Sequence, residues 1–67
     1  MSFNYALMHH YERVDAAVKE LADLWHQGVD INDDDIYFEV LERNGLLNDG
    51  FTLDHDEIAH QVNRRLR

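Results

Sequence analysis

The chain has 67 residues and a formal net charge of −8, from 14 acidic and 6 basic side chains. Such a charge repels nucleic acid and anionic membranes, so it argues against direct nucleic-acid binding and favours a basic protein surface as the partner. The sequence has no Cys, which excludes disulfides and thiolate metal sites, and no run approaching the ~18 apolar residues that span a membrane.

The first element in the chain is a long amphipathic helix, predicted over about residues 4–27. Asp15 and Lys19 form a favourable i,i+4 pair on it, and Gly28 provides its stop. Its apolar residues alternate at spacings of four and three, which is the pattern of a heptad seam: Leu7, Tyr11, Val14, Val18, Leu21 and Trp25.

Two shorter helices are predicted over about residues 33–44 and 55–66. Gly45 ends the first of them, and the arginines at the end of the second suit the helix dipole. All three helices begin with a hydrophobic staple: an apolar residue, a capping Asn or Asp, and an apolar residue four positions after the cap. The three staples are Phe3-Asn4…Met8, Ile31-Asn32…Ile36 and Leu53-Asp54…Ile58.

Between the two short helices, residues 46–52 are predicted to form a loop. Leu46, Leu47 and Phe51 are expected to tuck into the core from this loop. The Asp49-Gly50 pair also suits a hairpin turn, but the flanking segments are too short for an independent hairpin.

Together these elements predict an all-α fold in one cytoplasmic domain over residues 1–67: a small three-helix bundle with one long N-terminal helix and two shorter helices. The short 28–32 connection folds the second helix back along the C-terminal half of the first. The N-terminal half then lacks cover, unless the longer 45–53 connection lets the third helix reach it. A symmetric homodimer through the first helix would bury this surface instead. The expected dimer interface is Leu7, Met8, Tyr11 and Val14.

Ten of the acids lie between Val29 and Glu57, where Arg43 is the only base. Glu39 can pair with Arg43 at i,i+4. Six acids stand at two helix starts, where the dipole favours negative charge: Asp33, Asp34, Asp35, Asp54, Asp56 and Glu57. In an up-down-up bundle these starts form two acidic poles, about 18 Å apart. The remaining acids have no local structural role that the sequence indicates: Asp30, Glu42 and Asp49.

Two kinds of side chain on and before the 33–44 helix are candidates for partner binding. Phe38 lies off the apolar face of this helix and beside Tyr37, so both are candidate apolar contacts. The alternative is that Phe38 packs under the 46–51 loop. The candidate acidic contacts are Asp30, Asp33, Asp34, Asp35, Glu39 and Glu42.

A calcium loop is suggested by the Asp-rich run but fails at the positions that define it. Asp30, Asn32 and Asp34 match the first three side-chain ligands. Asp35 stands where Gly is required for the turn, and Leu41 stands where the bidentate Glu belongs. The acids are therefore better explained as residues that favour a helix start.

Other metal and catalytic motifs are also incomplete. Asp56 and His60 share a helix face but His55 does not, whereas catalytic zinc requires three protein ligands. No cofactor, metal or catalytic residue is therefore expected. Direct DNA reading is equally disfavoured, because the short helices would bring acidic N-termini to the phosphates.

These features favour a non-enzymatic acidic interaction or inhibitor protein that docks on a basic protein surface. In its sharpest form, the acids mimic nucleic-acid phosphates and block a nuclease, a restriction or CRISPR-type complex, or a DNA-binding protein. One alternative is an accessory or regulatory subunit that binds its partner by an apolar helix face. The other is a small metal-dependent enzyme that uses Asp56, His60 and His55.

Overall fold

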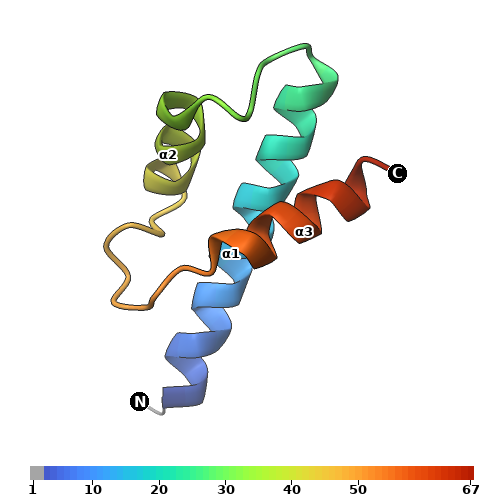
Figure 1. Ribbon diagram of the computed structural model, residues 1–67. Coiled ribbons are helices and arrows are strands. Elements are labelled where there is room, and N and C mark those ends of the chain that lie inside the picture. Colours follow the sequence, from blue (N-terminus) through green and yellow to red (C-terminus); the bar gives the residue numbers. More distant parts are fainter. Residues whose placement is uncertain (1–2) are drawn as a thin grey trace.

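The computed structural model describes residues 3–67 and folds them into three helices: α1 (Phe3–His26), α2 (Asp34–Arg43) and α3 (His55–Arg65). α2 lies beside the C-terminal half of α1, and α3 crosses the middle of α1 (Figure 1). The predicted all-α architecture with one long helix and two short ones is confirmed, and residues 3–67 contain no strand. None of the three helices combines the length and the apolar character needed to cross a membrane.

The core lies where α2, α3 and the loop after α2 converge on α1. The predicted heptad seam is correct only in its middle, because the two short helices leave both ends of α1 uncovered: Tyr11 is 61% exposed and Trp25 is 49% exposed. The core side of α1 follows the i, i+3, i+4, i+7 spacing of one helix face: Val14, Ala17, Val18 and Leu21. The opposite side is formed by Val40, Leu41, Leu46, Ile58 and Val62.

α1 and α2 end in the same way, because Gly28 and Gly45 both adopt the left-handed region, with φ of +87° and +76°. After Gly45 the chain turns back, and the N–H of Leu46 donates to the carbonyl of Leu41 at 2.9 Å. This Schellman geometry directs Leu46 into the core, as predicted. Leu47 is the next residue and is 43% exposed, so the prediction that it joins the core is wrong.

The caps of the two short helices were predicted with unequal success. Asp54 caps α3 as expected, and its carboxylate accepts the N–H of Glu57 at 3.0 Å. Asp33 rather than Asn32 caps α2, and its carboxylate accepts the N–H of Asp35 at 2.9 Å. The staple pattern placed this start one residue early, because the chain is still turning at Asn32.

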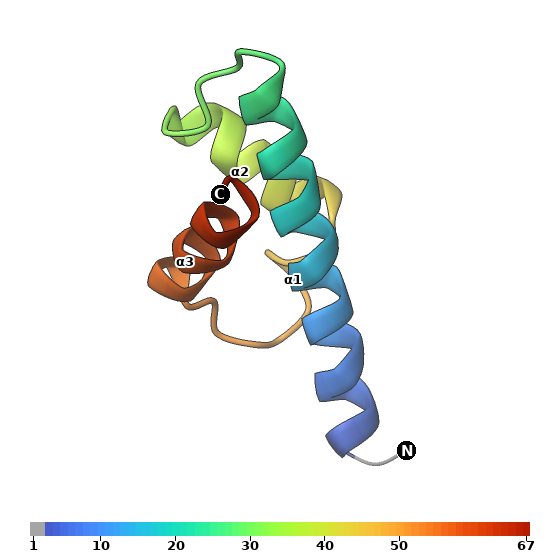
Figure 2. The same cartoon turned by 90° about the vertical axis from the view of Figure 1, so that its right-hand side faces the viewer.

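The N-terminal half of α1 projects beyond the other two helices (Figures 1 and 2). The molecule is accordingly elongated, with extents of 41 × 24 × 17 Å. The longer connection before α3 therefore does not bring that helix over the end of α1. α1 begins at Phe3, so Asn4 lies inside the first turn instead of capping it. The staple contact predicted for the Phe3 side chain lies outside the described residues.

Candidate functional site

The exposed face of α2 combines an aromatic ring with carboxylates. Phe38 is 43% exposed. Asp34 and Glu42 are also exposed and lie four residues before and after Phe38, so the three side chains form one stripe along the helix. Asp35, three residues before Phe38, adds a carboxylate beside this stripe. The result is an accessible ring framed by acids.

The alternative position for Phe38, under the 46–51 loop, is wrong. Its ring neighbours are Tyr37, at a centroid distance of 5.3 Å, and His55, at 6.0 Å. Both lie on the side of α2 that faces the start of α3. One edge of the Phe38 ring is thus supported by the fold, and the rest faces solvent.

Most of the acids predicted to bind a partner have no cation beside them. Glu39 is the exception, because Nη1 of Arg43 lies 3.6 Å from its carboxylate. Arg43 also bonds to Glu20 on α1, so its charge is shared between two acids. Within residues 3–67, the other five have no Lys, Arg or His at ion-pair distance: Asp30, Asp33, Asp34, Asp35 and Glu42.

Two of these uncompensated acids are held by backbone N–H groups. Asp33 caps α2, and Asp30 accepts the N–H of Asn32 at 3.0 Å. The contact of Asp30 gives this residue a local role that the sequence did not indicate. These two carboxylates are therefore oriented by the backbone and not by a cation.

Tyr37 connects α2 to the start of α3. Its hydroxyl oxygen lies 2.8 Å from Nδ1 of His55. Burial raises the pKa of Tyr37 above its ordinary value of 10.0, so the side chain stays a neutral phenol at neutral pH. Tyr37 is half-buried and engaged, so Phe38 is the more accessible of the two predicted apolar contacts. Both Tyr37, through this bond, and Phe38, through its ring, therefore link α2 to the start of α3 at His55.

The residues predicted for a dimer interface do not lie on one surface. Met8 is 50% exposed, Tyr11 is exposed and Leu7 is half-buried, all on the projecting part of α1. Val14 is buried in the core of the single chain, so it is unavailable to a second copy, and its assignment to the interface is wrong. The core cluster that contains Val14 also contains Ile58 and Val62 of α3. The dimer itself stays a prediction.

Asp49 lies in a buried polar cluster that the sequence did not reveal. Its side chain is only 5% exposed, and Oδ2 lies 2.6 Å from Nδ1 of His10 and 3.2 Å from Nη2 of Arg13. The N–H of Phe51 donates to Oδ1 at 3.1 Å. Burial raises the pKa of Asp49, but the hydrogen bonds from His10, Phe51 and Arg13 outweigh it, so this pKa lies below its ordinary value.

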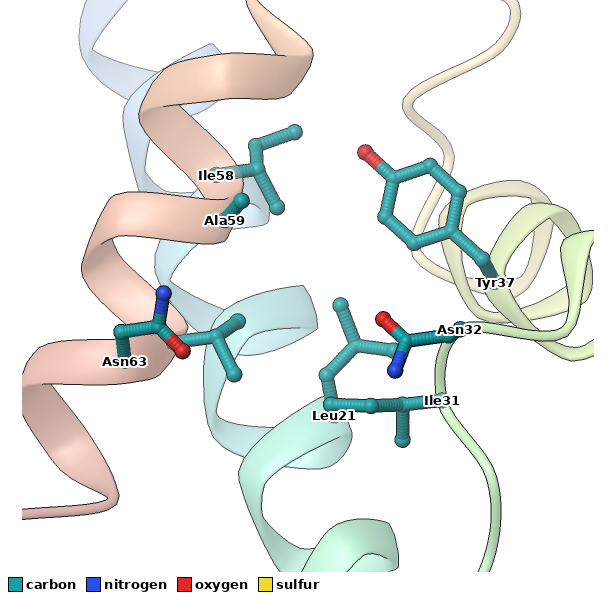
Figure 3. Close-up of a pocket in the computed structure, with 8 residues that line it drawn as sticks. Leu21, Ile31, Asn32, Tyr37, Ile58, Ala59 and Asn63 are labelled. Atoms are coloured by element: carbon teal, nitrogen blue, oxygen red, sulfur yellow. The ribbon is translucent and has the colours of Figure 1, made fainter.

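A cavity of about 150 Å³ opens between the three helices. Its apolar lining includes Leu21 of α1 and Ile58 of α3 (Figure 3). Tyr37 of α2, Asn32 of the preceding loop and Asn63 of α3 bring polar ends to the same space (Figure 3). This cavity adjoins the core, because Leu21, Ile58 and Val62 of its lining also belong to the core cluster.

Metal ligands do not gather within residues 3–67, where no three His, Asp or Glu side chains are placed to share an ion. His55 is engaged by Tyr37, while Asp56 and His60 lie exposed along α3. Comparisons of this chain with protein-family models, with curated proteins and with solved structures find no match.

Proposed function

We propose that this chain is a non-enzymatic docking protein whose exposed α2 face binds a basic surface on another protein. The observation that carries the proposal is the group of uncompensated carboxylates around Phe38. Asp34, Asp35 and Glu42 are exposed, have no cation partner within residues 3–67, and surround an accessible ring. An aromatic residue framed by charges is the arrangement typical of an interface centre with a polar rim.

The chemistry of this face indicates Arg and Lys on the partner. Carboxylates pair with guanidinium groups in bidentate fashion, and the face of a Phe ring attracts a cation that approaches it. Within one or two turns, α2 therefore offers a basic surface both carboxylates for ion pairs and an aromatic ring for a cation–π contact. The net charge of −8 adds long-range attraction for the same partner.

The sharper form of the proposal is nucleic-acid mimicry. Surfaces that bind phosphates use the same Arg and Lys side chains that bind carboxylates. A row of exposed acids on a rigid helix can occupy such a surface and exclude DNA or RNA from it. We propose a nucleic-acid-binding protein as the partner: a nuclease, a restriction or CRISPR-type complex, or a DNA-binding regulator. The absence of Cys suits an encounter in the cytoplasm.

A second candidate function rests on the projecting part of α1. Tyr5, Met8 and Tyr11 are exposed there, and they give this end an apolar character. An accessory or regulatory subunit that binds its partner by this helix face would use these residues in place of α2. Which helix face contacts the partner distinguishes the two functions.

The test begins with photocrosslinking of the full chain in host extract. A photoreactive phenylalanine analogue replaces Phe38 in one sample and Leu47 in the control, because both side chains are 43% exposed. The docking proposal expects a crosslinked protein from position 38 that is missing from position 47. A third sample labelled at Tyr11 identifies binding through α1, and crosslinking there alone would favour the accessory-subunit function.

Capture is followed by an affinity measurement on the purified partner. The Asp34→Asn/Asp35→Asn variant is compared with Asp23→Asn/Asp56→Asn, which removes the same charge from exposed acids elsewhere. We expect the first variant to bind at least about tenfold more weakly and with a shallower salt dependence. Equal losses of affinity in both variants would show that the acids act only through the net charge, and would contradict a binding site on α2.

Mimicry is separated from simple docking by competition with the nucleic acid that the partner binds. Mutually exclusive binding, with an inhibition constant matching the dissociation constant of the complex, supports mimicry. A ternary complex containing the chain, the partner and the nucleic acid overturns mimicry and leaves docking in place.

A further inference from the structure

The cavity between the three helices differs in chemistry from the surface around it. Within the described part of the chain, every residue that lines it is uncharged, although charged residues make up 30% of the sequence. Leu21, Ile58 and Val62 give it an apolar floor, because each also belongs to the core. An apolar floor with a few polar groups is the usual composition of a small-molecule site.

The two side-chain amides of this cavity are not used by the fold, whereas the Tyr37 hydroxyl already lies 2.8 Å from Nδ1 of His55. Within residues 3–67, neither the side-chain amide of Asn32 nor that of Asn63 is hydrogen-bonded to another protein group. Both amides and the Tyr37 hydroxyl point toward the same space from three segments of the chain (Figure 3). A packing fault in a core is lined by apolar atoms, whereas here donors and acceptors converge.

The size of the cavity limits the ligand. Its volume of about 150 Å³ equals that of an engineered protein cavity that binds benzene. One six-membered ring therefore fits within this volume. The chemistry of the lining limits the ligand further, because none of the lining residues carries a charge that could pair with an ion. An anion would lose its hydration on entry without gaining a cationic partner from the lining.

We propose that this cavity binds a neutral, ring-sized molecule that carries one hydrogen-bonding group, of the phenol class. The ring would lie on the apolar floor, and its hydroxyl would reach the Tyr37 oxygen or one of the two amides. This inference concerns a different surface from the docking face of α2, so either proposal can fail without the other.

The test is a titration of the full chain followed by methyl and amide NMR. Phenol is the positive probe, toluene tests the hydrogen bond, and benzoate tests the exclusion of anions. We expect saturable shifts centred on Ile58 and Val62 with phenol, with a dissociation constant on the order of 1 mM for a ligand of this size. We expect toluene to bind more weakly and benzoate to cause no saturable shift.

Two variants locate the binding. Ala59 lines the cavity, so Ala59→Leu should fill it and abolish the phenol shifts, whereas Ala16→Leu on the exposed side of α1 should leave them unchanged. Tyr37→Phe removes the hydroxyl together with its bond to His55, and it should weaken phenol at least about threefold while leaving toluene binding unaltered, which controls for the lost bond to His55. This second variant keeps the test decisive if Ala59→Leu does not fold.

Three results would overturn the proposal. The first is the lack of any saturable phenol shift in the unmodified chain. The second is phenol binding that persists in a folded Ala59→Leu variant, which would place the ligand elsewhere. The third is equal affinity for phenol and toluene in both the unmodified chain and Tyr37→Phe. That result would show that the polar groups of the cavity do not contribute to binding.

Discussion

His10 and Asp49 lie 39 positions apart in the sequence, yet Nδ1 of the histidine is 2.6 Å from Oδ2 of the aspartate. Both side chains are buried, and the ring of Phe51 packs on His10 at a centroid distance of 4.8 Å. The carboxylate thus fastens the loop between α2 and α3 to the long helix. Since this loop sets where α3 begins, the pair also determines how α3 crosses α1.

Asp49→Ala should destabilise the fold more than any change at an exposed acid. The substitution removes the acceptor for His10, for Arg13 and for the N–H of Phe51, and it leaves these groups poorly solvated. We expect a loss of about 1–3 kcal/mol in the free energy of unfolding, measured by urea denaturation.

The matched control for this prediction is Asp56→Ala, which removes an exposed carboxylate from the first turn of α3. Its effect should stay within about 0.5 kcal/mol. Equal losses in the two variants would mean that the buried cluster contributes no more than an ordinary surface charge.

The same cluster should make stability fall in acid. The pKa of Asp49 in the folded chain lies below its ordinary value of 3.8, so the unfolded chain binds more protons between these two pKa values. The contribution of Asp49 is therefore fully present above the unfolded pKa and is lost as the pH falls through the folded pKa. Urea unfolding of the unmodified chain and of Asp49→Asn, from about pH 6 to about pH 2.5, measures this contribution as a difference.

We expect the two chains to differ most at pH 6 and to converge in acid. Comparison with the variant is needed because other carboxylates also titrate over this range. A stability difference that is constant with pH would show that the carboxylate acts by shape alone.

The sequence predicted those parts of the fold that depend on short-range patterns. The spacing of Val14, Val18 and Leu21 predicted the core face of α1, and Asp54 was correctly identified as a cap. The contact between His10 and Asp49 joins distant segments, and neither residue belongs to a motif that specifies the other. The only signal was a histidine beside the apolar seam.

The sequence predicted which residues form the candidate docking face, but not which side chains contact them. The sequence indicated the acids of α2 and the outlying Phe38. It did not indicate that Tyr37 would turn to His55, because that contact depends on where the loop delivers α3. It also assigned Leu47 to the core, since a pair of adjacent leucines gives no information about which one the turn at Gly45 directs inward.

The two leucines at the end of α2 provide a direct test of the core. Leu46 is almost fully buried, whereas Leu47 is exposed. Leu46→Ala should lower the free energy of unfolding by about 2–4 kcal/mol, through lost burial and the cavity that remains. Leu47→Ala should change it by less than about 0.5 kcal/mol. The reverse order, measured by urea denaturation, would show that the turn after α2 points the other leucine inward.

The projecting end of α1 should associate with a second copy of the chain. Residues 4–14 contain one acid, Glu12, and one base, Arg13, so this end is neutral while the rest of the chain carries the full negative charge. Two copies therefore meet the least repulsion when they approach by their α1 ends. Burial of Met8 and Tyr11 supplies the attraction, since both are at least half exposed in the single chain.

The expected dimer is weak, because Val14 is buried in the single chain and only Met8 and Tyr11 of the four expected interface residues are exposed. Light scattering at rising concentration should show a mass that climbs from 8.0 kDa toward twice that value. Met8→Glu should hold the chain at the lower mass, whereas Leu47→Glu, which changes an exposed apolar residue outside α1, should not. A mass that stays at the lower value up to millimolar concentration would contradict association. If Leu47→Glu dissociates the dimer and Met8→Glu does not, the interface lies at the loop after α2 and not on α1.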